Sequence, residues 1–330
     1  MVESIFHNAK KVHKEKECKT MQNILFIGGA GFIGSSIIHQ LLEGDKSYSI
    51  TVLEPQFANV SRLQNCGVDI VRGQLADMEL LEKLITTKKI SKVVHLVSTM
   101  VPGCNYDDYI NEFKNIIFPT IRLMEICSSH HVQFVFFSSG GTVYGERSVI
   151  EPFCESDFLE PISYYGLSKQ VIENHILFEH RVSGLEYLII RPSNPYGHGQ
   201  NIYGKQGLIA VALGKILRGE PVTIWGDGCS VRDYIYIDDL AKVFEQILLS
   251  DAINEIINLG SGVGYSIKDI IKYLSEISEE EVKVEYTPSR HNDVKNMILN
   301  NKRMLQLAKI EFTPIQEGIR KFYYYEKQNI

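Results

Sequence analysis

The stretch 163–169 carries a tyrosine and a lysine four residues apart, Tyr165 and Lys169. Because a helix brings residues i and i+4 to one face, the two side chains would lie next to each other. A free phenol has a pKa of about 10 and is a poor base at neutral pH. A neighbouring ammonium group stabilises the phenolate and lowers that pKa. We therefore interpret the pair as one that moves a proton on or off an alcohol or sugar hydroxyl.

A glycine-rich loop upstream gives this pair its context. The segment 28–34 reads Gly-Gly-Ala-Gly-Phe-Ile-Gly, follows the short apolar run 23–27 and precedes a helical apolar pattern. Gly28 allows a tight turn, Gly31 lets the backbone approach a pyrophosphate, and Gly34 lets the helix pack closely. The N-terminus of the following helix offers N–H donors and partial positive charge to phosphates. The order strand, loop, helix predicts a dinucleotide site.

An acidic residue at the end of the second expected strand indicates which dinucleotide binds. Glu54 follows the glycine loop by about 20 residues, the distance at which such a side chain accepts hydrogen bonds from an adenosine ribose. A carboxylate there would repel a 2′-phosphate. The sequence therefore predicts NAD rather than NADP.

Short apolar strands alternate with helical patterns over the first 192 residues. Strands are expected at 23–27, 50–53, 92–97, 133–137 and 186–190, and helices at 32–43, 111–128 and 165–180. Such alternation implies right-handed βαβ crossovers and a parallel sheet covered on both faces. The predicted fold class is α/β, a Rossmann-type doubly wound parallel sheet with a smaller α/β substrate-binding lobe.

The pattern changes after Arg191. A turn-rich loop at 191–199 is not expected to be regular. Strands are expected at 222–225 and 256–259, helices at 207–218 and 266–277, and a strand leading into a helix at 234–249. We predict a Rossmann domain at 21–192, with some later chain returning to its sheet, and a second lobe at 193–330. Residues 1–20, rich in lysine, are expected to form a disordered extension.

Composition excludes several classes of partner. The net charge of −6 argues against a nucleic-acid surface. No apolar run approaches the roughly 20 residues that span a bilayer. No cluster of His, Cys and Asp has metal-ligand spacing. The six cysteines are scattered without disulfide spacing and suit a reducing cytoplasm. We expect a cytoplasmic protein with no metal, no nucleic-acid partner and no membrane partner.

Taken together, these segments resemble the extended short-chain dehydrogenase/reductase family, specifically its NAD-dependent sugar-nucleotide epimerase/dehydratase branch, which is UDP-glucose 4-epimerase-like. The resemblance runs from about residue 22 to the C-terminus, and its matching pieces are 28–34, 94–96, 138–145, 165–169, 191–197 and 225–234. It implies an NAD-binding domain followed by a lobe that binds mainly the nucleotide sugar.

The resemblance implies catalytic roles for four residues. Tyr165 would be the acid/base, and Lys169 would bind the nicotinamide ribose while lowering the pKa of Tyr165. The loop 138–142 would face the reacting sugar carbon. Relatives commonly carry Ser or Thr three residues before the Val-Tyr-Gly segment, where this chain has Gly140. Ser139 or Thr142 would then supply the hydroxyl, and we favour Ser139.

The resemblance also implies binding roles. The cofactor-binding residues would be Gly28, Gly31, Phe32, Ile33, Gly34, Glu54, Gln74, Leu75, Leu96 and Asn115, together with Tyr165 and Lys169. Asn115 would help to hold a helix and a strand around the nicotinamide. Gln74 stands where relatives often carry an Asp that contacts adenine. Substrate contacts would come from Ser139, Asn194, Arg232, Arg290 and Asp293, with the two arginines on the diphosphate and Asp293 on a nucleoside ribose.

Four functions remain open. The first is a 4-epimerase of a nucleotide-linked hexose, which recycles its own NAD. The second is an NAD(P)H-dependent reductase of a dTDP-4-dehydro-6-deoxy-hexose. A 4,6-dehydratase is less favoured, because Gly141 and Thr142 stand where that chemistry uses an acidic pair. A non-enzymatic NAD-binding scaffold would have been favoured had Tyr165 or Lys169 been missing.

The resemblance further implies a homodimer and a setting in surface-polysaccharide synthesis. The dimer would pair through the helices near 111–128 and 165–180. Ile116, Ile117, Leu123 and Ile126 supply apolar surface there, although the sheet could bury the same residues.

Overall fold

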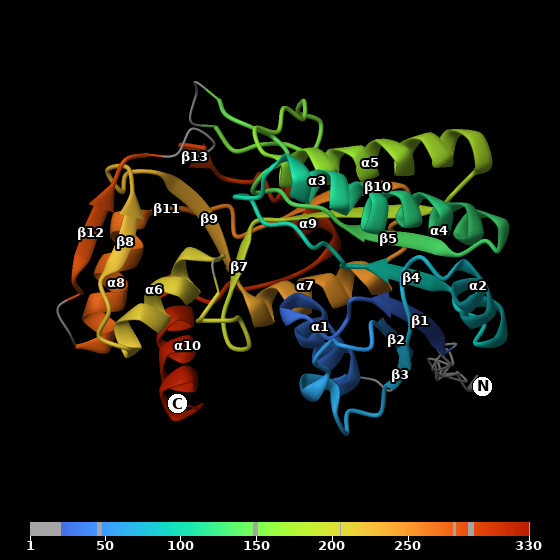
Figure 1. Ribbon diagram of the computed structural model, residues 1–330, viewed down its shortest axis with the longest axis horizontal. Coiled ribbons are helices and arrows are strands. Elements are labelled where there is room, and N and C mark those ends of the chain that lie inside the picture. Colours follow the sequence, from blue (N-terminus) through green and yellow to red (C-terminus); the bar gives the residue numbers. More distant parts are fainter. Residues whose placement is uncertain are drawn as a thin grey trace, which may run out of the picture.

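The computed structural model describes residues 21–44, 48–147, 151–204, 206–279, 282–289 and 294–329. The expected extension at 1–20 and the two expected substrate residues Arg290 and Asp293 lie outside these ranges. Figure 1 shows two lobes side by side, a larger one built on a broad twisted sheet and a smaller one at the left that includes the C-terminal helix.

The larger lobe is organised by a parallel sheet with seven strands in the described part of the chain. Their order across the sheet is β10 (Glu255–Leu259), β6 (Tyr187–Pro192), β5 (Gln133–Phe137), β4 (Lys92–His95), β1 (Gln22–Ile27), β2 (Tyr48–Glu54) and β3 (Asp69–Arg72). Every neighbouring pair is parallel. The chain order reverses between β1 and β4, where open α/β sheets bind ligands at the carboxyl ends of their strands. The predicted fold class is confirmed.

Helices cover both faces of this sheet (Figure 1). α1 (Phe32–Glu43) and α7 (Ile237–Leu249) lie on one face, whereas α2 (Met78–Thr87), α4 (Phe118–Ser129) and α5 (Tyr164–Ser183) lie on the other. Strand β1 shows why the sequence supports two cores. Its consecutive residues Leu25 and Phe26 point to opposite faces and are both fully buried. Phe26 lies in the cluster with α1 and α7, and Leu25 lies in the opposite cluster.

The helix expected at 111–128 is interrupted. α3 (Tyr106–Glu112) starts at a capping box in which Asn105 and Asp108 exchange hydrogen bonds. A π-helical turn (Phe113–Ile117) then joins α3 to α4. Such a turn inserts one extra residue and changes which side chains face the sheet.

The smaller lobe is built around β9 (Val231–Tyr236). This strand pairs with β7 (Asn194–Tyr196), β11 (Gly264–Ser266) and β13 (Asn296–Met297), and a separate pair joins β8 (Val222–Trp225) to β12 (Val284–Thr287). α6 (Leu208–Leu217), α8 (Ile267–Ser278) and α10 (Ile315–Asn329) pack around a core that includes Leu213 and Phe322. The short elements η1 (Ser61–Leu63) and α9 (Lys302–Leu307) complete the described structure.

Two further observations bear on the predictions. The turn-rich loop at 191–199 contains β7, so the expectation that it lacks regular structure is wrong there. The backbone groups of β7 find partners on β9, which a local pattern does not reveal. Among the described helices, none combines the length and apolar character that crossing a membrane would require.

Candidate active site

The glycine loop between β1 and α1 forms a tight cradle. Gly28 has φ +80°, and a Cβ atom there would stand 2.6 Å from Cγ2 of Val97. At Gly34 a Cβ atom would stand 2.6 Å from the carbonyl oxygen of Gly29. At Gly31 a Cβ atom would make only an ordinary contact, 3.6 Å from the carbonyl oxygen of Gly28, and the residue itself is exposed. Only glycine fits the first two positions, and the third leaves the backbone open to a phosphate.

Glu54 closes this cradle from the end of β2. One carboxylate oxygen accepts the backbone N–H of Ala30 at 2.6 Å, and the side chain is buried. Burial raises the pKa of Glu54, while the bond from Ala30 and the charge of Arg72 oppose that rise. Among the described residues no donor binds the other oxygen, so it can accept a hydrogen bond from a ribose hydroxyl. The cradle and the free acceptor fit NAD.

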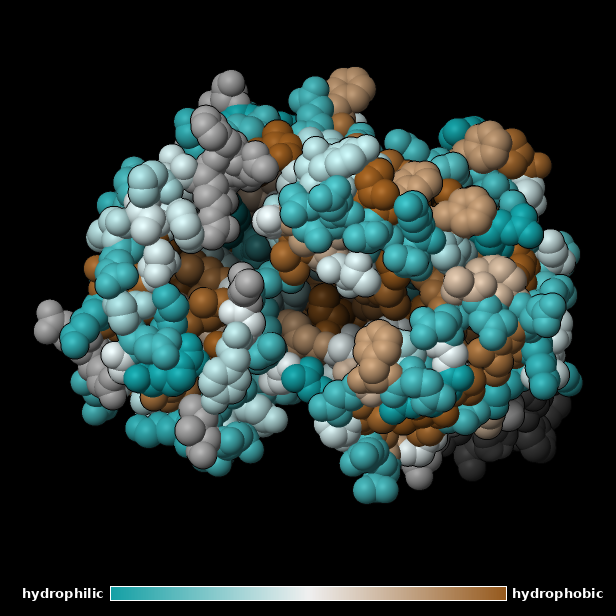
Figure 2. Space-filling view, viewed as in Figure 1, coloured by the Kyte–Doolittle hydropathy of each residue, from teal (hydrophilic) through white to brown (hydrophobic). Residues whose placement is uncertain are grey.

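A cavity of about 1300 Å³ opens between the two lobes. Figure 2 shows it as a hollow near the centre of this face. Of the residues expected from the sequence, those that line it are Gly28, Gly31, Phe32, Ile33, Gly34, Leu96, Ser139, Thr142, Tyr165, Lys169, Asn194 and Arg232. The cavity thus joins the expected cofactor loop, the proton-transfer pair and one expected phosphate ligand.

Four expected cofactor residues lie outside this lining, and three of them, Glu54, Gln74 and Leu75, lie near the ends of β2 and β3. Glu54 acts through the cradle, as described above. Gln74 is exposed, and Leu75 is buried in the core under α2. Their positions neither support nor oppose an adenine contact.

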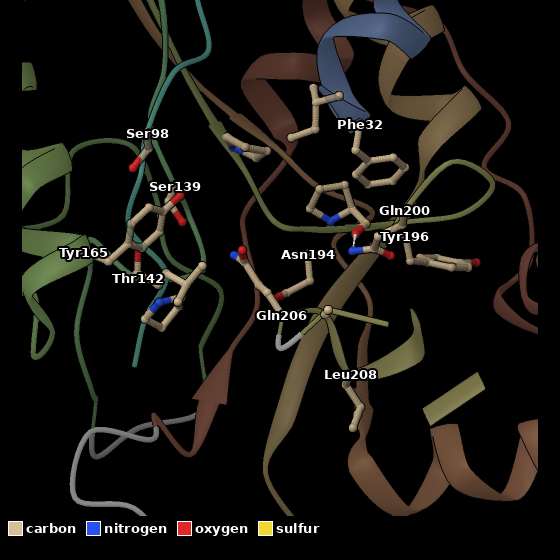
Figure 3. Close-up of a pocket in the computed structure, with 18 of the residues that line it drawn as sticks. Phe32, Ser98, Ser139, Thr142, Tyr165, Asn194, Tyr196, Gln200, Gln206 and Leu208 are labelled. Atoms are coloured by element: carbon tan, nitrogen blue, oxygen red, sulfur yellow. Dashed lines mark hydrogen bonds between the residues drawn. The ribbon is translucent and has the colours of Figure 1, made fainter. Parts of the chain in front are cut away.

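The start of α5 brings Tyr165 to the loop that follows β5. Ser163 caps the helix by accepting the N–H of Gly166 at 3.1 Å. A Cβ atom on Gly166 would stand 2.6 Å from the carbonyl oxygen of Thr142, so the first helical turn packs directly on that loop. In Figure 3, Tyr165, Ser139, Thr142 and Ser98 gather at one side of the cavity, and Asn194 and Gln206 project toward them from the other lobe.

Lys169 lies one turn further along α5 and is 2% exposed. Its ammonium group donates to the carbonyl oxygen of Phe137 at 3.1 Å and stands 5.7 Å from the centre of the Tyr165 ring. Burial lowers the pKa of Lys169 to about 8, although the charges of Glu112 and Glu173 oppose that change. The lysine is therefore able to change its charge near physiological pH.

The pKa of Tyr165 departs from the sequence expectation. Burial raises it to about 12, the charge of Glu112 raises it further, and a hydrogen bond with Ser139 lowers it. We expected Lys169 to lower this pKa, but burial is the larger effect in the structure. The phenol keeps its proton until further positive charge or a hydrogen-bond partner arrives.

The missing hydroxyl at Gly140 has a steric cause. A Cβ atom there would stand 2.6 Å from Cδ1 of Leu299 and 2.9 Å from the carbonyl oxygen of Arg191. The neighbouring Ser139 provides the hydroxyl that meets Tyr165. Thr142 also lines the cavity, and its buried hydroxyl has no hydrogen-bond partner among the described residues. Leu299 lies far away in the sequence, so only the fold reveals this constraint.

Asn115 is not at the site. It lies in the π-helical turn, is exposed and does not line the cavity. The extra residue in this turn directs Ile116 and Ile117 to the sheet and leaves Asn115 in solvent. The buried polar side chain in this region is instead Glu112. The sequence did not identify it, because nothing in the residues around it indicates that this carboxylate is buried.

The expected substrate residues are partly described. The Asn194 amide donates to the backbone carbonyl of Asp233 at 2.8 Å, which fixes the side chain at the cavity wall. Arg232 lines the cavity from β9, and its guanidinium donates to the backbone carbonyl of Val231. Within the described ranges no cluster of His, Cys, Asp and Glu has the arrangement of a metal site.

Comparisons with known proteins agree with this geometry. Residues 24–260 match the model of the family described as NAD dependent epimerase/dehydratase family. A putative UDP-glucose 4-epimerase of Methanocaldococcus jannaschii is 33% identical, over 93% of this chain and 99% of that protein. A dTDP-4-dehydro-6-deoxyglucose reductase of Escherichia coli is 32% identical, over 90% of this chain and 95% of that protein. The crystal structure of a UDP-glucose 4-epimerase from Thermotoga maritima with UDP-glucose superposes with a TM-score of 0.86 at 31% identity, covering 93% of this chain and 99% of that one.

Proposed function

Because the chain belongs to the NAD-dependent epimerase/dehydratase family of short-chain dehydrogenase/reductase enzymes, we propose that it is a sugar-nucleotide 4-epimerase. The observation that carries this proposal is the single cavity that joins the glycine cradle, the Tyr165–Lys169 pair and Arg232. A nucleotide-linked hexose fits such a cavity, since its diphosphate needs a cation and its sugar needs a proton-transfer group. The relatives from M. jannaschii and T. maritima, both named as UDP-glucose 4-epimerases, support UDP-hexose as the substrate class.

Each residue of the site has a distinct role in the proposed reaction. Tyr165 accepts the proton of the C4 hydroxyl and returns it after the sugar has turned in the cavity. The Ser139 hydroxyl and the Lys169 ammonium favour the phenolate during that transfer. Bound NAD supplies the oxidising and reducing capacity at C4. Asn194 would hold the sugar, and Arg232 would pair with the diphosphate, as would Arg290, with Asp293 on the ribose. Gln74 and Leu75 would border the adenine.

A second candidate is a reductase of a 4-keto-6-deoxy nucleotide sugar. The E. coli relative with that name, 32% identical over 90% of this chain, favours it. The same residues would serve, with Tyr165 donating a proton to the C4 oxygen. For this role the phenol must be protonated at neutral pH, and a pKa of about 12 satisfies that requirement.

The experiment that tests the proposal is incubation of the purified protein with UDP-glucose without added nicotinamide, followed by proton NMR. An epimerase yields UDP-galactose and releases about one NAD per chain on denaturation. An absence of that product, together with oxidation of added NADH by dTDP-4-dehydro-6-deoxyglucose, would establish the reductase instead. Tyr165→Phe should lower the rate by roughly 10²–10⁴-fold. Tyr164→Phe, the same change at the adjacent and more exposed ring, should leave it nearly unchanged.

We propose further that 21–192 with β10 holds NAD, and that the lobe at 193–330 binds mainly the nucleotide sugar. The described cysteines are all free, which supports a reducing, cytoplasmic location.

We also propose a homodimer that pairs through the outer faces of α4 and α5. The sheet buries Ile116, Ile117 and Leu123, so these do not form that surface. Other apolar side chains take their place on the outer face, namely Phe118, Phe178 and Val182, each about half exposed. Figure 2 shows apolar side chains gathered over this region at the upper right. Such a patch is typical of a protein–protein interface.

A further inference from the structure

Glu112, the last residue of α3, is a buried carboxylate that forms no salt bridge with any residue the structure describes. It is 1% exposed. In the part of the chain that the structure describes, no lysine or arginine forms a salt bridge with it. Burying a carboxylate is unfavourable unless hydrogen bonds replace the lost water. A buried charge with only neutral donors therefore requires an explanation.

The donors all come from one segment, the residues that follow β4. One oxygen of Glu112 accepts the Ser98 hydroxyl at 2.8 Å. The other accepts the backbone N–H of Thr99 at 3.0 Å and also the Thr99 hydroxyl. Helix α3 is thereby tied to the segment through three hydrogen bonds. Ser98 lines the cavity, and Figure 3 shows it close to Ser139 and Tyr165.

The charge of Glu112 also reaches the proton-transfer pair. It raises the pKa of both Tyr165 and Lys169. The other ionisable groups around Lys169 are Glu173, whose charge is matched by a salt bridge to Arg191, and His95, whose pKa burial lowers to about 3. His95 is therefore neutral, and Glu112 remains as the negative charge that Lys169 and Tyr165 both face.

We propose that Glu112 is a positioning residue of this site, which holds Ser98 at the wall of the sugar cavity and keeps a fixed negative charge beside Tyr165 and Lys169. Its kinetic consequence rests on the proposed function. The charge favours the protonated form of Lys169. The π-helical turn that follows sets the side-chain register in which Glu112 faces inward and Asn115 outward.

Two substitutions separate the charge from the hydrogen bonds. Glu112→Gln removes the charge but preserves the bonds, because the amide oxygen can accept both Thr99 donors and the amide nitrogen can donate to the Ser98 oxygen. Thr99→Val removes one hydrogen bond and preserves the charge. If Glu112 only stabilises the fold through its hydrogen bonds, Thr99→Val should change the Lys169 pKa and kcat/KM more than Glu112→Gln does.

The decisive measurement is the pKa of Lys169, followed by carbon NMR of labelled lysine side chains and assigned by the signal lost in Lys169→Arg. In Glu112→Gln we expect this pKa to fall by about one unit, because a nearby negative charge has been removed. The alkaline limb of kcat/KM should move to lower pH by the same amount. Thr99→Val should shift neither. An unchanged Lys169 titration in folded Glu112→Gln would overturn the proposal.

The titration needs no substrate, so it tests Glu112 even if the 4-epimerase proposal fails. If Glu112→Gln does not fold, Ser98→Ala tests the positioning role alone. We then expect KM for the nucleotide sugar to rise roughly five-fold with kcat and the pH profile nearly unchanged, as loss of one hydrogen bond predicts. An unchanged KM would overturn the proposal that Glu112 positions Ser98 for the sugar.

Discussion

Burial and charge act against each other at Tyr165 and Lys169. Burial favours the neutral form of both, which raises the pKa of the phenol to about 12 and lowers that of the lysine to about 8. At neutral pH both groups therefore keep their protons, the phenol firmly and the lysine by about one pH unit. The acid–base behaviour of the site therefore depends on the pKa values of both Tyr165 and Lys169.

The pH dependence follows from Lys169. As the pH rises through about 8, the ammonium loses its proton and no longer favours the phenolate. We expect kcat/KM for the nucleotide sugar to fall above that pH, with the limb absent in Lys169→Arg, whose side chain stays charged. A pH series of initial rates measures this. A wild-type profile that stays level through about pH 10 would contradict it, because an unshifted lysine titrates near there.

Sequence reasoning at this scale found the residues but not their environments. The four-residue spacing placed Tyr165 and Lys169 on one helical face, and the structure brings both into the cavity. The spacing carries no information on burial, so the direction of the Tyr165 pKa was wrong. For Asn115 the spacing gives no sign of the π-helical turn, in which the structure leaves this residue exposed and outside the cavity lining.

At the scale of elements, the loop after β5 is compressed between three neighbours. Leu299 and the backbone of Arg191 fill the space beside Gly140, and the first turn of α5 packs on Thr142. By contrast, a Cβ atom on Gly141 would meet nothing nearer than Asn194 at 3.6 Å, an ordinary contact. Gly140 therefore has a steric reason to be glycine, whereas Gly141 has none among its neighbours.

This difference gives a matched pair of substitutions. Gly140→Ser, which restores the hydroxyl common in relatives, should destabilise the protein by about 1–3 kcal/mol because the core must shift to admit it. Gly141→Ser should cost much less. Thermal unfolding of the two variants measures the difference. Equal melting temperatures would show that Leu299 moves aside without cost.

The elements themselves were predicted where the sequence has a continuous apolar run. The strands at 133–137 and 222–225 and the helix at 32–43 have the expected bounds. β3 and β12 were missed because their residues are only partly buried and show no apolar run. α10 was missed because its apolar residues are diluted by charged ones.

At the scale of the whole molecule, the cavity exists only because two lobes meet. Its walls come from the glycine loop, α1, β5, β6 and α5 on one side. On the other side they come from β7, β8, β9 and the chain near Gln206. Local patterns predict the elements of each lobe but not their relative placement. In the same way, the proposed dimer would form only where the exposed apolar faces of α4 and α5 meet those of a second copy of the chain.

A single charged substitution on α5 should disrupt the proposed dimer interface. Phe178 is 49% exposed on α5, so Phe178→Glu would bury a carboxylate in the proposed interface and favour the monomer. Phe57→Glu, at a site that is 86% exposed on the β2 side of the sheet, is the matched control and should leave the assembly unchanged. Light scattering after size-exclusion chromatography measures the mass. A monomeric wild type, or a dimeric Phe178→Glu, would refute the interface.

The order of strands has a consequence for synthesis on the ribosome. β6 ends at Pro192, but its outer neighbour β10 ends at Leu259, after much of the smaller lobe has been made. Until then the nascent chain carries β6 as an open edge, although all its residues are buried in the finished sheet. Such an edge is prone to pair with other chains. A gene truncated after the first lobe should therefore yield aggregates, and release of residue 259 from the ribosome marks the earliest completion of the sheet.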